Sequence, residues 1–430
     1  MEIKEHQKLF DDFQKNIDWF NALDAQDFYL NNNEVFIFWD HQQRAYTASY
    51  VIGAQIVNGE PVVVTPKFPK VDYLRMFDYC LRSGMESDSF SKIYGIDLSG
   101  RKIKTNAFRT NVLSPLLVTH YLFVLRALVS QGLKKGYIRK EDNIKKVKGK
   151  VLLLQNDRKN IINKRFDRII CNFQEYSTDI PENRLLKRAL LFSKQVIFRM
   201  QNHETFTEIT HSLNKCLAAF ENVSDQILIS EVNTIKENKL YKNYSDAILL
   251  AKMILKKFDY SISKASETQE EHEVPPFWID MPLLYEHYVL GKLKEKNNTI
   301  WYQKDYASGV PDFLMPNEKI ILDTKYKDTD RHIFDLDNIR QLSGYARDKR
   351  LRKDFFSKED PGEIIKCVLI YPDRNRITDF NDKAAIQNIP LYDGSIPIEK
   401  LIQESEAKSK TYKEFYRICI ELPVINKHLS

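Results

Sequence analysis

Two aspartates and a lysine lie in one short segment of predicted strands, residues 309–327, which read GVPDFLMPNEKIILDTKYK. The apolar runs FLM and IIL mark the two strands, and Asp312 and Asp323 stand at their ends. Asp323 and Lys325 are two residues apart, and side chains at this spacing point to the same face of a strand. The segment therefore predicts a hairpin that gathers three charged groups beside a hydrophobic core.

The turn of this hairpin is PNEK, residues 316–319. With Asn317 and Glu318 as its central residues, Met315 faces Ile320 and Phe313 faces Leu322. On the same register Asp312 faces Asp323, which places their Cβ atoms about 5 Å apart.

Two opposed carboxylates on a half-buried face need a cation or a shared proton. Carboxylate oxygens suit Mg²⁺ or Mn²⁺, and a metal held in this way activates water for phosphodiester hydrolysis. A nearby lysine orients that water or stabilises charge on the transition state. A DxK tripeptide taken alone is more typical of a surface ion cluster, but the apolar flanks place these carboxylates beside a core.

Two predicted helices bring further polar groups. A helix at about 280–295 carries Glu286 among apolar residues, either as an exposed face residue or as a group that binds or orients a metal. A helix at about 335–348 places Gln341 and Tyr345 at i and i+4, on one face. These two residues are either ordinary surface residues or supports near the metal or a DNA phosphate.

The order of elements around the hairpin predicts a compact α/β domain over residues 266–430. Strands are expected at 299–304, 310–315, 319–326 and 364–371, with a short one near 387–392. The polar segment 261–276 ends in Pro-Pro and is the best candidate linker.

The preceding residues divide into a β-rich region, 1–105, and a mainly helical region, 106–265. Strands are expected at 34–40, 46–57 and 60–68, with a hairpin turn at 58–59, while residues 1–30 show roughly helical spacing. Helices are expected over 111–133, 183–222 and 240–260. The fold class is therefore α+β and multidomain.

A basic segment at 134–168 holds thirteen Lys and Arg against four Asp and Glu. It is either a solvated face or a surface for phosphate or an acidic partner. The net charge of +6 is mildly basic. Five widely spaced cysteines, no signal-peptide pattern and no membrane span predict a cytoplasmic protein without structural zinc.

The hairpin residues, with Glu286 before them and Gln341 and Tyr345 after them, resemble the PD-(D/E)XK nuclease core. The segments FWIDMPLLYEHYVLGKL, SGVPDFLMPNEKIILDTKYK and LDNIRQLSGYA resemble the McrC family, the nuclease subunits of McrBC-type modification-dependent (type IV) restriction systems. IGAQIVNGEPVVVTPKF and IKKVKGKVLLLQNDRKN extend the resemblance, which covers most of residues 45–395.

The resemblance implies an Mg²⁺-dependent DNA endonuclease whose C-terminal domain, 266–430, has the restriction-endonuclease-like fold. Asp312, Asp323, Lys325 and Glu286 would be catalytic, with Asp312, Asp323 and Thr324 at the metal. Gln341 and Tyr345 would support them near the metal or a DNA phosphate.

The resemblance also implies docking on an McrB-like AAA+ GTPase ring, with GTP bound by that partner, double-stranded DNA as substrate and modified cytosine recognised by the partner. The chain has no GxxxxGK[ST] phosphate-binding loop, in agreement with a motor on another chain. The basic segment would reach into the ring, and Arg158, Lys159 and Arg165 are its candidate contacts.

Two other functions remain open from the sequence. One is a non-catalytic activator of the GTPase partner with a vestigial nuclease site. The other is a stand-alone repair nuclease with the same core, which would cut DNA without partner or nucleotide.

Overall fold

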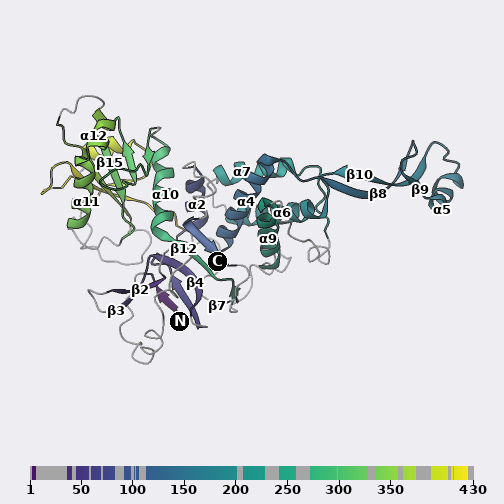
Figure 1. Ribbon diagram of the computed structural model, residues 1–430, viewed down its shortest axis with the longest axis horizontal. Helices are drawn as coiled ribbons and strands as arrows, with labels where there is room; N and C mark the ends of the chain where they lie inside the picture. The colour runs from purple at the N-terminus through teal and green to yellow at the C-terminus, as the bar shows by residue number, and fades with distance from the viewer. Residues whose placement is uncertain are drawn as a thin grey trace. The chain divides into compact units, whose positions relative to one another are not determined.

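Figure 1 shows the computed structural model of the chain. The residues described are 2–5, 36–40, 45–57, 60–68, 71–82, 92–97, 101, 103–105, 113–200, 207–227, 242–257, 272–297, 299–327, 335–356, 362–373, 389–404, 408–409 and 411–424.

The chain forms two compact units, and the first is built from two separate parts of the sequence. The first unit combines residues 1–116 with 268–430, and the second holds residues 117–267. The N-terminal β-rich region and the C-terminal α/β region thus contribute to one unit, while the predicted boundaries at 105 and 265 stay a prediction.

The N-terminal sheet of the first unit has the strand order β1-β5-β4-β12-β6. The hairpin pairs β4 (Val51–Val57) with β5 (Glu60–Thr65), and β1 (Glu2–Lys4) joins β5 in parallel. β12 (Phe277–Asp280), from far along the chain, lies between β4 and β6 (Tyr94–Ile96). Two smaller ladders join β2 (Ile37–Asp40) to β3 (Ala45–Ala48) and β7 (Ile103–Thr105) to β11 (His272–Val274).

The second sheet of this unit has the order β13-β14-β15-β16-β18-β17. Its antiparallel part contains β13 (Trp301–Tyr302), β14 (Phe313–Met315) and β15 (Ile320–Thr324). Its parallel part adds β16 (Lys366–Pro372), β18 (Phe415–Ile420) and β17 (Leu391–Tyr392).

Helices α11 (Leu336–Arg347) and α12 (Lys349–Phe356) pack on one face of the second sheet, where Leu314, Ile321 and Leu369 are buried with them. α10 (Met281–Lys294) begins directly after β12, and the Asp280 carboxylate caps it by accepting a hydrogen bond from the Leu283 N–H at 2.9 Å. α2 (Tyr73–Arg82) packs against α10, and α13 (Ile398–Glu404) follows β17.

The second unit is a helical body with a long β-ribbon. Most of α4 (Leu113–Gln131) belongs to it, with α6 (Pro181–Met200), α7 (Thr207–Ala219) and α9 (Lys242–Lys257). The Tyr121 hydroxyl donates to the Leu186 carbonyl at 2.6 Å, which joins α4 to α6.

The ribbon pairs β8 (Gly136–Ile144) with β10 (Ile169–Ser177) and extends away from the helices of its unit (Figure 1). Its far end, here called the tip, comprises residues 145–168 and holds β9 (Lys150–Val151), α5 (Leu153–Asn156) and the π-helix η3 (Asp157–Ile161). Three asparagines brace the tip: Asn160 donates to Asn143 at 2.9 Å and to Asn156 at 2.7 Å.

A mixed α/β architecture is confirmed, and the main helices and strands of the sequence analysis are present. The predicted helix 183–222 is wrong as one element, because it contains two helices, α6 and α7. The helical spacing of residues 1–30 is wrong for residues 2–4, which form β1. The turn at 58–59 lies outside the described residues, as does most of the candidate linker. In the described part of the chain, no helix is long and apolar enough to span a membrane.

Candidate active site

The β14–β15 hairpin positions the two aspartates as its sequence pattern predicts. The register pairs Phe313 with Leu322 and Met315 with Ile320, which confirms the predicted alignment. Asp312 directly precedes β14, and its backbone carbonyl accepts a hydrogen bond from the Gln303 N–H at 3.1 Å.

Asp312 is fixed by its neighbour across the hairpin. Its Oδ2 accepts hydrogen bonds from both the backbone N–H and the hydroxyl of Thr324, each at 2.7 Å. Asp312 Oδ1 takes no part in these two bonds, which hold the carboxylate beside the end of β15. Thr324 therefore acts in the structure as the donor that orients Asp312.

Asp323 forms an ion pair with the predicted lysine. Its side chain is only 2% exposed, and its Oδ2 lies 2.5 Å from Lys325 Nζ. Lys325 Nζ also donates to Gln341 Oε1 at 3.2 Å. The ammonium group is thereby held between a carboxylate of β15 and an amide of α11.

Helix α11 continues this chain of contacts to the loop before β14. Gln341 Nε2 donates to the Tyr345 hydroxyl at 2.9 Å, and that hydroxyl donates to the Val310 carbonyl at 3.2 Å. Gly309 permits the approach, because it has φ +118° and a Cβ there would lie 3.1 Å from the Tyr345 ring. Of the predicted i, i+4 pair, Gln341 thus contacts Lys325 directly, and Tyr345 is linked to Lys325 through Gln341.

Glu286 approaches the site from α10. Gln303 Nε2 donates to Glu286 Oε1 at 2.8 Å, and Gln303 adopts the left-handed region with φ 43°. Sequence reasoning missed Gln303. No periodic pattern marks it, because it follows the two-residue strand β13.

The carboxyl groups influence one another electrostatically. The pKa of Asp312 is raised to about 7, chiefly by burial and then by the charge of Asp323, while the Thr324 hydrogen bonds lower it. The pKa of Glu286 is raised to about 8, chiefly by burial and then by the charge of Asp312. Burial also raises the pKa of Asp323, against the positive charge of Lys325, which lowers it. The site therefore gathers three carboxyl groups that hold their protons more tightly than they would in water.

Tyr326, the residue after Lys325, anchors the strand end to the N-terminal sheet. Its ring is 4% exposed and packs edge-on against Phe68 at a centroid separation of 5.7 Å, and the Tyr285 ring lies at 5.6 Å. Lys67 Nζ lies 4.9 Å from the centroid of the Tyr326 ring. Sequence reasoning missed this role, although Tyr326 alternates with Lys325 and hence faces the opposite side.

The donor set fits a hard divalent cation. Asp312 and Asp323 supply carboxylate oxygens, and their raised pKa values reflect a burial that a cation would offset. Among the described residues, no three His, Cys, Asp or Glu side chains are grouped closely enough to hold a metal by themselves. A cation there would therefore need further oxygen ligands, such as a backbone carbonyl or water.

The three predicted docking residues belong to the other unit, at the tip. Arg158 and Lys159 lie in η3, Arg165 follows it, and all three are exposed. The structure thus groups the predicted site residues of the hairpin, α10 and α11, and separates them by unit from the predicted docking residues.

The sequence matches the model of the McrBC 5-methylcytosine restriction system component over residues 48–354, more than half of the chain. The chain belongs to this family of restriction-system components. No curated protein matches the sequence significantly.

Two solved assemblies from Thermococcus gammatolerans resemble the chain. One is a half-complex of McrB AAA+ hexamers with bound McrC, at 15% identity and TM-score 0.38, covering 99% of this chain and 95% of the other. The second is a cryo-EM structure of the McrBC complex, at 15% identity and TM-score 0.30, covering 68% of this chain and 86% of the other.

Proposed function

We propose that the chain is the DNA endonuclease subunit of a GTP-dependent McrBC-like complex, with a PD-(D/E)XK site at the β14–β15 hairpin. The observation that carries the proposal is the convergence of Asp312, Asp323 and Lys325, with Thr324 fixing the first and Gln341 the last. These are the groups that phosphodiester hydrolysis requires.

Each residue has a defined task in this mechanism. Asp312 and Asp323 would hold Mg²⁺ or Mn²⁺, and the Thr324 carbonyl would be a further ligand. When bound, the cation polarises a phosphoryl oxygen and lowers the pKa of a coordinated water. The Lys325 ammonium, held by Asp323 and Gln341, stabilises negative charge that develops on the phosphate. Glu286, on α10, would bind the metal or orient one of its ligands.

The partner in this proposal is an McrB-like AAA+ GTPase ring, which the tip of the ribbon engages and stimulates. Large apolar side chains are exposed there, including Leu154 at 79%, Ile162 at 72% and Phe166 at 77%. Clustered exposed apolar residues mark interaction sites. Arg158, Lys159 and Arg165 add positive charge to the same end, and a π-helix is frequent at functional sites.

The test is cleavage of methylated and unmethylated plasmid DNA with Mg²⁺, with and without the GTPase partner and GTP. Wild type is expected to cut only in the full mixture. Lys325→Ala is expected to lose cleavage by more than about a hundredfold, because one charge-stabilising group is worth about 10²–10³ in rate. It should still stimulate GTP hydrolysis.

Lys327→Ala is the matched control, because Lys327 lies two residues further on and is half exposed, 3.7 Å from Asp335. It should cut like wild type. Cleavage by Lys325→Ala at the control rate would reject the assignment of the site. Stimulation of GTP hydrolysis without any cleavage by wild type would instead identify a non-catalytic activator.

A further inference from the structure

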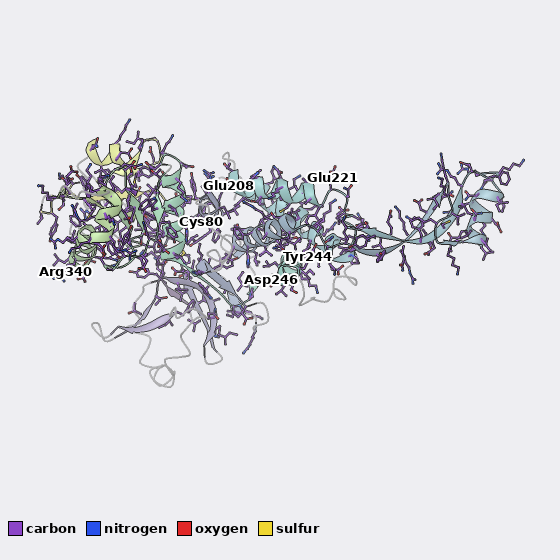
Figure 2. The ribbon with its side chains drawn as sticks, turned by 45° about the horizontal axis from the view of Figure 1, so that its top comes forward. Cys80, Glu208, Glu221, Tyr244, Asp246 and Arg340 are labelled. Atoms are coloured by element: carbon purple, nitrogen blue, oxygen red, sulfur yellow. The ribbon has the colours of Figure 1, made fainter. Side chains whose placement is uncertain are left out.

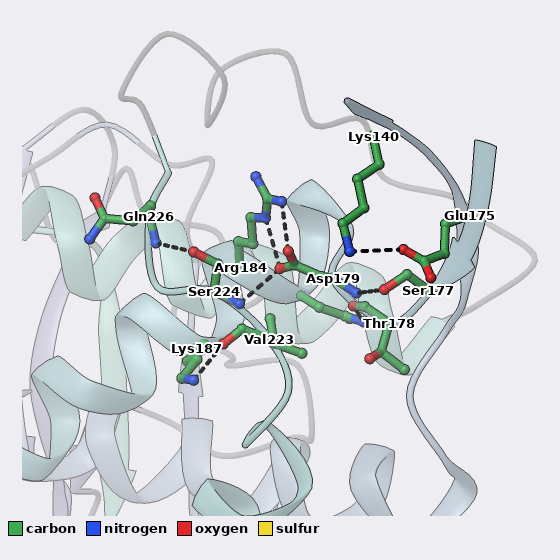
Figure 3. Close-up of polar contacts among 11 residues, drawn as sticks. Lys140, Glu175, Ser177, Thr178, Asp179, Arg184, Lys187, Val223, Ser224 and Gln226 are labelled. Carbon is green, nitrogen blue, oxygen red and sulfur yellow. Dashed lines mark hydrogen bonds and ion pairs between the residues drawn. The ribbon is translucent and has the colours of Figure 1, made fainter. Parts of the chain in front are cut away.

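The junction between the ribbon and the helices is closed by a hydrogen-bond network, and Figure 3 shows its outer part around Asp179, Arg184 and Ser224. β8 begins at Gly136 and β10 ends at Ser177, and these two residues pair with each other. The chain therefore enters the ribbon through Lys134 and leaves it through Thr178, and both lie beside the first turn of α6.

Asn183, in that first turn of α6, is bonded to both chain segments. It is fully buried, and its side-chain amide donates to the Lys134 carbonyl at 3.0 Å and to the Thr178 carbonyl at 2.7 Å. Both N–H groups of the amide are used, one on each side of the ribbon. An asparagine is matched to this position because it offers two donors and one acceptor.

Tyr244 of α9, labelled in Figure 2, completes the network. Its hydroxyl donates to Asn183 Oδ1 at 3.1 Å and accepts from the Lys134 N–H at 2.6 Å. The entering strand, the leaving strand, α6 and α9 are thereby joined through two side chains. Since Tyr244 is 6% exposed, these bonds are shielded from competing water.

Charged contacts surround this buried centre. Arg184 binds Asp179 in two parallel hydrogen bonds of 2.8 and 2.7 Å, and Asp179 also accepts from the Ser224 N–H at 2.8 Å. Lys134 Nζ lies 2.9 Å from Glu182 Oε1 on the other side. Bidentate pairs of this kind add geometric specificity.

We propose that Asn183 is a positioning residue that fixes the direction in which the ribbon leaves the helical body. An isolated two-stranded ribbon has little stability of its own, so its direction depends on how its base is held. The network holds the ribbon in one orientation relative to the helices of its unit. The tip is therefore preorganised for docking on its partner. The last part of this inference rests on the proposed docking function.

The direct test is the distance between tip and body, measured by double electron–electron resonance. Spin labels are attached at Gln155→Cys on the tip and Gln195→Cys on α6, both exposed positions. The described native cysteines, Cys80, Cys171, Cys216, Cys367 and Cys419, are buried. In the wild-type background we expect one narrow distance distribution.

Asn183→Ala is expected to broaden that distribution about twofold or more, because the Lys134 and Thr178 carbonyls both lose the Asn183 amide, and the Thr178 carbonyl keeps the Ile180 N–H at 2.9 Å. Tyr244→Phe removes one hydroxyl and keeps the ring, so it should broaden the distribution less and serves as the second variant if Asn183→Ala folds poorly. Asn172→Ala is the matched control, since the Asn172 side chain donates to Glu141 on the ribbon itself, at 2.9 Å, and its loss should leave the distribution unchanged.

The proposal is overturned if both Asn183→Ala and Tyr244→Phe keep the narrow wild-type distance distribution.

GTPase stimulation is a separate measurement of function. If Asn183→Ala and Tyr244→Phe broaden the distance distribution, a higher concentration of each variant should be needed for half-maximal GTPase stimulation. At saturating concentration, each variant should stimulate as much as wild type. If wild type itself stimulates no GTPase, the docking function fails, and the distance distributions still decide the role of Asn183.

Discussion

At the scale of single residues, Asp312 tests whether the site holds a cation. Asp312→Asn keeps an oxygen for the Thr324 hydrogen bonds and removes the charge, so the fold should persist. The affinity for Mn²⁺, measured by titration calorimetry, should fall by more than about tenfold. Asp305→Asn, an exposed aspartate seven residues earlier, is the control and should bind like wild type. Equal affinities in the two variants would contradict the metal assignment.

The raised pKa values predict an unusual dependence of stability on pH. Asp312 and Glu286 have pKa values of about 7 and about 8 in the folded chain, above the ordinary values of 3.8 and 4.5 for these carboxyl groups. The folded state therefore binds more protons than the unfolded state between about pH 4 and pH 8, so these groups lower stability as pH rises through that window. Thermal melts without metal should show a lower Tm at pH 8 than at pH 6.

Divalent cations should reverse this trend. Mn²⁺ binding displaces protons from the Asp312 and Glu286 carboxyl groups. The apparent Mn²⁺ affinity should therefore rise by up to about tenfold per pH unit for each proton displaced. The Tm increase caused by Mn²⁺ should be larger at pH 8 than at pH 6. Chelator added at pH 8 should remove the increase. An increase independent of pH would count against these carboxyls as the site of binding.

The alternation of a strand was sufficient to predict that Asp323 and Lys325 share a face, and the turn PNEK set the register. The supports were harder to predict. Gln303 reaches Glu286 through a left-handed backbone, and the Tyr326 ring is held by Phe68, from a distant segment. Neither contact follows from local periodicity, because both depend on tertiary structure.

At the scale of elements, α2 and α10 approach each other closely at Gly291. A Cβ at Gly291 would lie 2.1 Å from the Tyr79 carbonyl oxygen, and backbone cannot yield as a flexible side chain does. Gly291→Ala should lower the free energy of unfolding by about 1–3 kcal/mol, as overpacking does. Urea denaturation would measure it.

Gly344→Ala is the matched control, because a Cβ at Gly344 of α11 meets nothing within 4 Å. Alanine there should stabilise the helix by about 0.5–1 kcal/mol through backbone entropy. If both substitutions stabilise, the close contact between α2 and α10 is not present in solution.

Elements were predictable where one face is buried. The helices α4, α10 and α11 and the strands β14 and β15 have apolar periodicity, and the sequence analysis located them. The ribbon was not predicted as strands, because β8 reads GYIRKEDNI and exposes most of its side chains on both faces. Without a buried face a strand carries no alternating pattern, so the same residues indicated only a basic segment.

At the scale of the whole chain, the division into units is discontinuous in sequence. β12 pairs with β4 and β6, more than 170 residues earlier, and Tyr326 packs on Phe68. The sequence analysis predicted three consecutive domains, because local composition does not indicate which distant strands pair. In the structure, residues of the N-terminal sheet instead support the strand end that bears Lys325.

The proposed nuclease site and the proposed docking tip lie in different units, so substitutions should separate cleavage from GTPase stimulation. Arg158→Ala with Lys159→Ala should reduce GTPase stimulation by the chain about tenfold or more, because a few central residues dominate most interfaces. Mn²⁺ binding by this double variant should match wild type, since the tip and the hairpin share no residue. Lys325→Ala should show the opposite pattern, with stimulation kept and cleavage lost.

Lys135→Ala with Arg139→Ala removes the same charge from exposed positions near the base of the ribbon and should stimulate nearly normally. If that control loses as much stimulation as the tip variant, overall positive charge drives the association, and the tip has no special role.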